Sequence, residues 1–455
     1  MVSATASPST VSPGVRLGYA VGSFCAANFN TLPGLLLLYY MTNVLAVPAL
    51  LAGVVVFLPK AWDLVINPLV GQWSDRTTSR WGPRRPWLLA GAAVLPLFFA
   101  LMFIGPPLKG TAAGVFVGVM FLIAATGFAL FEVPYKAMPA EMTSNYHERT
   151  SLLQWRMVFV AVAIGMSGIL APVIAGDSLD GYRQMGIVFA VILLVAMIGS
   201  FYGTARAPYT GQQQSAGTLR FQLRAARTSK PFLWLLGLSS AQTLAAGVML
   251  AGAPYFAAYT LGDPDTKNTL FAALIGPMLV TMPLWVWLSR RLDKRVAMIL
   301  AGVLFAVGDL LAIGTPALGS LYAHVAVVVV GFGYAGLQLL QFSMLADVIA
   351  YDGAVSGERR GGVFTGLWTA AENAVQAFGA TIYGAVLAIG GFISSDPDNP
   401  VTQPESARTA VIVGLTAIPA VITILGIWMT VRYDLTAERL AALDKTPAAE
   451  AAPEA

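Results

Sequence analysis

Residues 62–71 read Trp62-Asp63-Leu-Val-Ile-Asn67-Pro68-Leu-Val-Gly71, a run of Leu, Val and Ile with a carboxylate near its start. An ionisable side chain inside a membrane span costs about 3 kcal/mol or more and is kept where function requires it. Lys60 and Asn67 lie three residues before Asp63 and four after it, so a helix places all three on one face. The pattern predicts a membrane helix whose polar face lines a cavity.

The composition of the whole chain indicates the same class of protein. Hydrophobic residues make up 57% and charged residues 11% of the 455 residues, and the mean hydropathy is +0.70. Soluble domains carry about 25% charged residues, so the chain reads as an integral membrane protein. Windows of about 20 apolar residues predict an all-α membrane protein of about twelve transmembrane helices. The predicted spans lie near 17–42, 49–73, 86–105, 112–137, 152–175, 184–205, 232–261, 269–290, 296–315, 319–349, 361–392 and 406–432.

The distribution of Lys and Arg predicts the orientation, because cytoplasmic loops retain positive charge. Most of the 27 basic residues fall at the two ends of the chain and in every second loop, whereas the opposite side holds Lys109, Arg183, Lys267 and Arg408. We therefore expect both termini to be cytoplasmic. The net charge of +4 is explained by this topology and gives no support for a nucleic-acid partner.

A long polar segment divides the predicted spans into two sets of six. The expected organisation is a disordered cytoplasmic N-terminus (1–16), an N-terminal bundle (17–205), a cytoplasmic middle loop (206–231), a C-terminal bundle (232–432) and a cytoplasmic tail (433–455). After the fourth span comes Glu141-Met-Thr-Ser-Asn-Tyr146-His-Glu148-Arg149, and after the tenth comes Asp347-Val-Ile-Ala-Tyr351, then Glu358-Arg359. Transporters built from such repeats bind substrate near the bilayer midplane between the halves.

Several short motifs follow one another in a fixed order along the chain. They are Leu17-Gly-Tyr-Ala-Val-Gly22, Trp62-Asp63, Asn67-Pro68-Leu-Val-Gly71, Asp75-Arg76-Thr-Thr-Ser-Arg80-Trp81-Gly82-Pro-Arg-Arg-Pro86-Trp87, Val133-Pro134-Tyr135 and Ala346-Asp347-Val-Ile-Ala-Tyr351. Together they resemble the glycoside–pentoside–hexuronide:cation symporters, the melibiose-permease branch of the major facilitator superfamily. The resemblance covers nearly the whole chain. It implies the major facilitator fold, two six-helix bundles and cation-coupled transport, and it does not specify a substrate.

The resemblance implies a cation site at Asp63 and Asn67, with one acid of the family pattern replaced. Asp63 matches the first acid, but an amide stands at the second, and Ile66 and Ala129 replace two further polar positions. Sodium prefers several oxygen ligands, including charged ones. A lone carboxylate in a low dielectric binds a proton more readily, although the nearby Lys60 opposes this. We therefore expect no cofactor, and a proton rather than sodium as the coupling ion.

The substrate residues implied by the resemblance also depart from the family pattern. Glu132 matches the sugar-contacting acid of the fourth helix, Asn28 stands at the acid of the first, and Lys136 and Gln338 replace aromatic residues. Melibiose itself is therefore not expected. The full candidate set is Asn28, Lys60, Glu132, Lys136, Arg156, Gln338, Gln341, Trp368, Glu372 and Asn373. Glu132 and Lys136 are also spaced i,i+4, so a local ion pair is the alternative reading of that pair.

A cytoplasmic gate is predicted from the charged loop motifs. The basic cluster after Asp75 resembles the latch between the second and third helices of the superfamily, and its simpler reading is positive-inside anchoring. The candidate gate residues are Asp75, Arg76, Arg80, Arg84, Glu141, Arg149, Asp347 and Arg359.

These features predict a monomeric, multi-pass transporter of the inner membrane that takes up a sugar or glycoside by alternating access, as a proton symporter. The alternative within the same family is a carrier of lysophospholipid or another amphiphile, with sodium as its candidate coupling ion and with Lys136 and Arg156 holding a phosphate. A membrane enzyme would need a nucleotide loop, a metal motif or a nucleophile, and the sequence contains no Walker loop and no HExxH motif. The expected partners are a small sugar or glycoside and the lipid bilayer.

Overall fold

The computed structural model describes residues 11–143, 146–208, 229–263, 266–356 and 361–435. Within these ranges the secondary structure is helical, apart from one isolated bridge between Asp396 and Asn399. The predicted all-α class is therefore confirmed. Arg359 lies outside the described residues.

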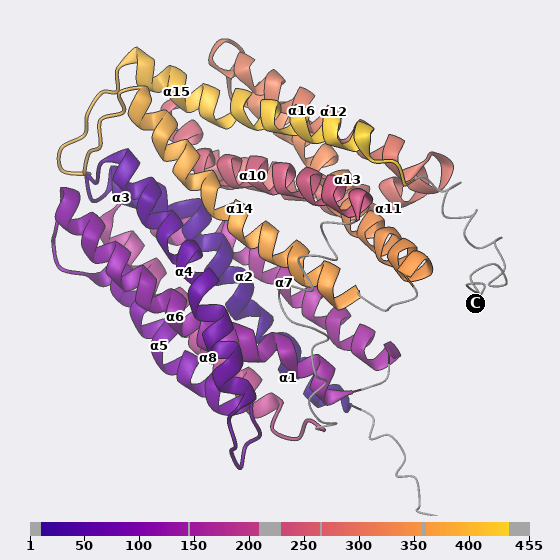
Figure 1. The fold of residues 1–455 in the computed structure, drawn as a ribbon. Coiled ribbons are helices and arrows are strands. Elements are labelled where there is room, and N and C mark those ends of the chain that lie inside the picture. Colours follow the sequence, from indigo (N-terminus) through magenta and orange to yellow (C-terminus); the bar gives the residue numbers. More distant parts are fainter. Residues whose placement is uncertain (1–10, 144–145, 209–228, 264–265, 357–360, 436–455) are drawn as a thin grey trace, which may run out of the picture. The chain divides into compact units, whose positions relative to one another are not determined.

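The chain divides into two compact units (Figure 1). The first comprises residues 1–214 with 380–408, and the second comprises 215–379 with 409–455. The end of the eleventh predicted span and the loop after it thus pack with the N-terminal unit. The domain limits read from the sequence stay a prediction.

Helices of the first unit run from the N-terminus to the middle loop (Figure 1). The first predicted span forms α1 (Pro13–Val21), α2 (Ser23–Leu32), a π-helical turn (Pro33–Leu37) and α3 (Leu38–Asn43). A proline at the start of the turn explains the change of helix type, because its missing N–H leaves one backbone hydrogen bond unmade. The remaining helices are α4 (Ala49–Asp75), α5 (Arg85–Ile104), α6 (Gly110–Met142), α7 (Tyr146–Ala175) and α8 (Leu179–Gly203).

Helices of the second unit follow the same apolar pattern. They are α10 (Lys230–Tyr259), α11 (Thr266–Arg291), α12 (Lys294–Leu311), the 3-10 turn η2 (Ala312–Gly314), α13 (Thr315–Ser356) and α16 (Ala417–Arg432). Two further helices, α14 (Gly361–Ile389) and α15 (Glu405–Leu415), cross the division between the units. Gly319 interrupts α13 with φ of 81°, a left-handed conformation that favours glycine.

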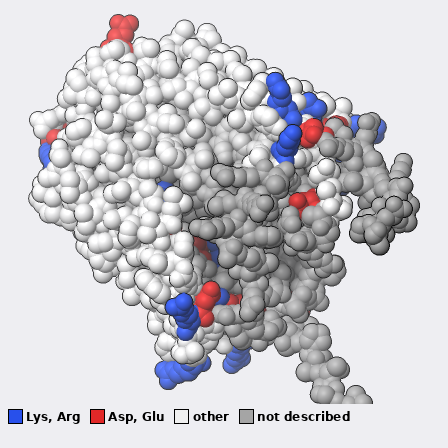
Figure 2. All heavy atoms as spheres, in the orientation of Figure 1, with Lys and Arg blue, Asp and Glu red and all other residues white. Residues whose placement is uncertain are grey.

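Ten helical stretches of the described chain are long and apolar enough to cross a membrane. One of them, Lys294–Val355, covers α12 and all but the last residue of α13. The helix α14 is not among the ten. Figure 2 shows a broad uncharged surface with Lys and Arg side chains gathered in patches at its margins. Exposed apolar side chains such as Val195, Val280 and Leu321 are those expected to face lipid.

Small residues let the helices pack closely inside each unit. In the first unit, Gly91 of α5 lies against the backbone of Gly127 in α6, and Gly18 of α1 lies against Gly203 of α8. In the second, Gly333 of α13 lies against Phe305 of α12. Such contacts hold membrane helices together where the hydrophobic effect between helices is weak. In the first unit they hold α6, which carries Glu132 and Lys136, against α5, and α1 against α8.

Candidate substrate and cation site

Lys60 and Asp63 lie one turn apart on α4, with Pro59 on the preceding position of the same helix. The Lys60 ammonium donates to Asn30 Oδ1 of α2 at 2.5 Å. Asn30 in turn donates its Nδ2 to the Ala26 carbonyl at 2.7 Å, which directs the amide oxygen toward Lys60. A neutral amide therefore holds this cation.

Asp63 is half-buried, and its Oδ1 is buried without a hydrogen-bond partner in the part of the chain that the structure describes. The carboxylate interacts electrostatically with Lys60, Lys136 and Glu132. Asn67 lies half-buried one turn further along α4. The structure thus places Asp63 in a charged cluster that spans α4 and α6.

Glu132 and Lys136 form the ion pair that their i,i+4 spacing predicts. Their charged atoms are 2.8 Å apart, with the Glu132 side chain 8% exposed and that of Lys136 41% exposed. Only Glu132 Oε1 is used, because Oε2 is buried and has no hydrogen-bond partner among the described residues. One carboxylate oxygen is therefore left for a further donor.

Arg156 of α7 extends the cluster to a third helix. It interacts electrostatically with Glu132 and lies beside the Tyr135 hydroxyl. Tyr135 is held in place because its hydroxyl donates to the Tyr19 carbonyl at 2.8 Å and its ring stacks on Tyr19 at 4.5 Å. The Arg156 Nε has no hydrogen-bond partner within the described ranges.

The hydrogen bonds given for Asn28 are made to residues outside this cluster. Its Oδ1 accepts from Ser167 Oγ at 2.5 Å, its Nδ2 donates to the Phe24 carbonyl at 2.7 Å, and the residue is fully buried. In this structure Asn28 joins α2 to α7.

In the second unit, the predicted residues of α13 and α14 form their own polar groups. Gln341 donates to Gln338 at 2.5 Å, and Gln338 donates to the Tyr334 hydroxyl at 2.7 Å. Ser239 of α10 donates to Glu372 at 3.2 Å. The remaining predicted positions differ in burial, since Trp368 is 2% exposed and Asn373 is exposed.

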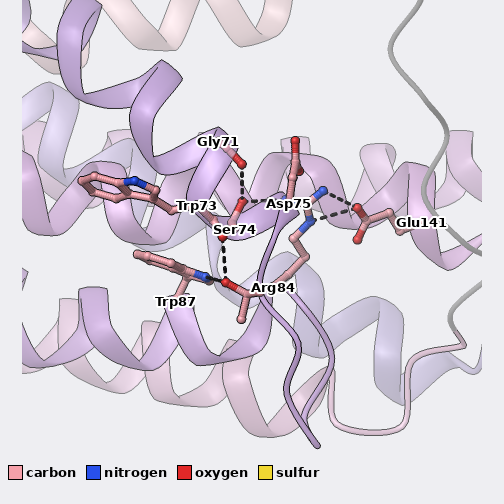
Figure 3. Close-up of polar contacts among 8 residues, drawn as sticks. Gly71, Trp73, Ser74, Asp75, Arg84, Trp87 and Glu141 are labelled. Atoms are coloured by element: carbon pink, nitrogen blue, oxygen red, sulfur yellow. Dashed lines mark hydrogen bonds and ion pairs between the residues drawn. The ribbon is translucent and has the colours of Figure 1, made fainter.

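Two candidate gate residues of the first unit, Asp75 and Glu141, meet at the guanidinium of a third, Arg84 (Figure 3). Arg84 lies 2.6 Å from Asp75 and donates to Glu141 at 2.8 and 2.5 Å and to Ser74 at 2.6 Å. Burial lowers the pKa of Arg84, but the carboxylates of Glu141 and Asp75 outweigh it and raise that pKa overall. Arg84 thus ties the end of α4 and the end of α6 to the start of α5.

The other basic residues of this loop have different contacts. Arg85 donates to the Phe201 carbonyl at 2.9 Å, Arg80 lies over the Trp81 ring at 5.0 Å, and Arg76 is exposed. The structure describes the backbone of Arg149 in α7 and not its side chain.

The second unit repeats the arrangement of the first. Lys294 at the start of α12 donates to Asp347 of α13 at 2.6 Å. Arg84 at the start of α5 pairs in the same way with Glu141 near the end of α6. The sequence repeat around Glu141 and Asp347 therefore recurs as a pair of equivalent ion pairs, one in each unit.

Sequence reasoning missed several neutral partners of the candidate site residues. These partners are Asn30, Ser74, Ser239 and Tyr334, together with the cation Lys294. Asn30 could have been found as a second amide two residues after Asn28 in an apolar span. Within the described residues there is no group of three His, Cys, Asp or Glu side chains that could hold a metal ion.

Comparison with known proteins identifies the family of this chain. A family model described as MFS/sugar transport protein matches residues 18–437. The putative glycoside/cation symporter YagG of Escherichia coli K12 is 25% identical and covers 94% of both chains. The glucuronide carrier protein homolog of the same organism is 24% identical, covering 84% of this chain and 85% of its own.

Solved structures show the fold. A D-xylose-proton symporter aligns with 93% of this chain and 98% of its own at a TM-score of 0.66 and 14% identity. The predicted major facilitator fold is therefore confirmed. With the family model matching nearly its whole length, this chain belongs to the MFS/sugar transport protein family of multi-pass membrane transporters.

Proposed function

We propose that the protein takes up a sugar or glycoside by alternating access, as a proton symporter. The observation that carries the proposal is the pair of incompletely satisfied carboxylates, Asp63 Oδ1 and Glu132 Oε2, on adjacent membrane helices. Buried oxygens of this kind bind protons or hydroxyl donors, because an unpaired buried acceptor costs about 1–3 kcal/mol. The names of the relatives support a sugar-like substrate, since one is a putative glycoside/cation symporter and another a glucuronide carrier homolog.

In this mechanism Asp63 binds the coupling proton and Glu132 accepts a substrate hydroxyl. Lys60 is held by Asn30 and interacts with Asp63, so protonation of Asp63 changes the charge balance of the cluster. Gln338, Gln341, Trp368, Glu372 and Asn373, all in the second unit, keep their sequence-based assignment as proposed substrate-binding residues. The ion pairs of Arg84 and Lys294 are proposed as parts of a cytoplasmic gate that must rearrange in each cycle.

The proposal includes an inner-membrane location with both termini cytoplasmic, a monomer, and no cofactor besides the coupling proton. The basic residues at the cytoplasmic ends of the predicted spans support this orientation.

Uptake into proteoliposomes tests the proposal. We expect radiolabelled glycosides to accumulate when the external solution is more acidic, and the accumulation to collapse when a protonophore is added. Absence of uptake of any mono-, di- or oligosaccharide, together with uptake of lysophospholipid, would contradict a sugar substrate and favour the amphiphile carrier.

A further inference from the structure

Asp309 lies in α12 of the second unit, is 1% exposed, and has no part in the proposed site. Both of its carboxylate oxygens are buried and have no hydrogen-bond partner among the residues that the structure describes. Gly308, the residue before it, lies against the backbone of Ala326 and Val330 in α13. The carboxyl group is therefore enclosed between closely packed helices, without a polar partner in the described part of the chain.

The helices packed against α12 bring no charged group to Asp309. The face of α13 that meets α12 carries Tyr322 and Tyr334, one turn on either side of that contact, and phenolic hydroxyls are neutral at ordinary pH. The helix α16 carries its one ionisable side chain, Arg432, in its last position, and α11 carries ionisable side chains only in its first and last turns. On α12 itself the nearest charged residue is Arg295. Within the described ranges, no charged side chain interacts electrostatically with Asp309.

An ionised carboxylate that is buried without a counter-charge or a hydrogen-bond donor is strongly disfavoured, so such a group takes up a proton. The neutral acid can donate its O–H to a backbone carbonyl of its own helix, as Ser and Thr side chains do. We propose that Asp309 is a second proton-binding site, separate from Asp63. It holds a proton while α12, α13 and α16 are packed as in this structure, and it gives that proton to water when water reaches it. Such a site would exist whichever substrate the protein carries.

Water has a place on the same side of α12. A cavity of about 10 Å³ lies between α10, α12, α13 and α16, and Gln242, Gly302 and Thr423 are among the residues that line it. Gln242 is 4% exposed, and neither its amide nitrogen nor its amide oxygen has a hydrogen-bond partner within the described residues. The same is true of the hydroxyl of Thr423, which is 5% exposed. Three such polar atoms around a space of this size suit one bound water molecule.

Along α12, Phe305 lies between this cavity and Asp309. Gly302, Phe305 and Asp309 follow one another at spacings of three and four residues, so they share one face of the helix. Gly302 and Asp309 are about 10 Å apart along the helix axis, which is too far for one water molecule to bridge. Phe305 is 1% exposed, and its ring centroid lies 6.2 Å from that of Tyr334 on α13. The Phe305 ring therefore closes the route from the cavity to the acid, and its displacement would admit water.

Infrared spectroscopy of the full-length protein in liposomes tests the site directly, because a protonated carboxylic acid has a C=O stretching band that a carboxylate lacks. We expect a component of this band at neutral pH that is lost in Asp309→Asn. The same component should remain in Asp63→Asn and in the control Asp180→Asn, which changes a carboxylate whose side chain is 81% exposed. Identical spectra for the wild type and Asp309→Asn would overturn the proposal. No substrate is needed, so a failure of the proposed sugar transport leaves this measurement unaffected.

Transfer of the same samples into D₂O tests the route. The Asp309 component should shift slowly in the wild type, because deuterium enters only with water, and sooner in Phe305→Ala. Phe232→Ala is the matched control, because it removes an equally buried ring from α10 that packs on Phe364. Equal exchange rates in the wild type and Phe305→Ala, or equal acceleration by both variants, would overturn Phe305 as the barrier.

Thermal unfolding of the wild type and Asp309→Asn gives a readout that needs no assignment of a band. An Asp carboxyl in an unfolded chain ionises above about pH 3.9, whereas the folded protein holds Asp309 neutral. Unfolding of the wild type therefore releases a proton and becomes easier as the pH rises, while the variant has no such proton to release. The melting temperature of the wild type should fall relative to that of Asp309→Asn between about pH 5 and 8. A difference that stays constant over this range would overturn the proposal.

Discussion

Asp63 shows how a single charged residue in an apolar run indicates the chemistry of a site. Its carboxylate lies in the middle of α4, interacts with two lysines, and leaves one buried oxygen without a partner among the described residues. If Asp63 served only to pair with the two lysines, we would expect both of its carboxylate oxygens to have partners. The proposed role in binding the coupling ion would account for both its position and its incomplete hydrogen bonding.

Asp63→Asn is predicted to abolish concentrative uptake while substrate counterflow continues. An amide of nearly the same shape keeps the site intact but cannot take up a proton, and exchange needs no net ion movement. Uptake and counterflow in proteoliposomes separate the two. Asp180→Asn, at the exposed start of α8, serves as the control. Undiminished accumulation by the Asp63 variant would remove this residue from coupling.

Glu132 is predicted to be a substrate ligand as well as the partner of Lys136. Glu132→Gln should weaken substrate binding about ten- to more than a hundredfold, because a charge-assisted hydrogen bond contributes roughly 1.5–3 kcal/mol. Isothermal titration of Glu132→Gln, Lys136→Met and the double variant gives the coupling between them. Full rescue of binding in the double variant would mean that Glu132 only neutralises Lys136.

At the scale of helices, the apolar windows predicted the elements better than their ends. The predicted span 49–73 corresponds to α4 at Ala49–Asp75, and 112–137 lies within α6 at Gly110–Met142. Hydropathy cannot locate the π-helical turn at Pro33, because the backbone there is set by packing and by a missing N–H rather than by apolarity. The Glu132–Lys136 pair was predictable from local spacing. The Lys60–Asn30 contact was not, since it joins two helices through a neutral amide.

Arg84 is predicted to hold the end of α4, the start of α5 and the end of α6 together. Arg84→Gln should destabilise the protein by roughly 1.5–3 kcal/mol, because it removes the charge-assisted hydrogen bonds that Arg84 donates to the buried Glu141 carboxylate. The double variant Arg84→Met with Glu141→Leu should be less destabilised than the single one. Thermal unfolding in detergent measures both. Arg80→Gln, which changes a guanidinium lying on the Trp81 ring, is the matched control.

An ion pair between Lys109 and Asp396 links the loop after α14 to the loop before α6 in the first unit. Their charged atoms are 3.0 Å apart, Ser395 N donates to the Thr42 carbonyl at 2.9 Å, and Ala46 N donates to the Ser395 carbonyl at 3.1 Å. The hydrogen bond from Lys109 lowers the pKa of Asp396, and the same bond raises the pKa of Lys109. Residues 380–408 therefore pack with helices that are distant in the sequence.

Stability should accordingly depend on pH through this ion pair. A lowered Asp396 pKa contributes stability above the unfolded value of about 3.9, and that contribution is lost as the pH falls through the folded value. A raised Lys109 pKa contributes below about 10.4 and is lost as the pH rises through its folded value. The difference in melting temperature between the wild type and Lys109→Met should be constant between these limits and shrink under acid. A difference that does not change with pH or added salt would contradict the ion pair.

For the whole molecule, the proposed coupling ion would distinguish this chain from the sodium-coupled pattern it resembles. Asn67, Ile66 and Ala129 stand where oxygen ligands would be needed, and Ile66 packs with Val70 and Ala129 in a small apolar cluster. A hard cation requires several oxygens, whereas a proton requires one basic atom with an unshared lone pair. Asp63 Oδ1 is such an atom among the described residues.

We therefore predict that a pH gradient drives uptake and that replacing sodium with choline does not change it. Initial rates in proteoliposomes, measured with each gradient imposed alone, decide the point. Ile66→Asn with Asn67→Asp adds back oxygen ligands on the same helix and should introduce sodium stimulation, because the added carboxylate and amide supply more of the oxygens that a hard cation requires. Steep sodium dependence of the wild type without a response to pH would show that other oxygens complete a sodium site, and Asp63 would then act as one ligand among several rather than as the proton acceptor.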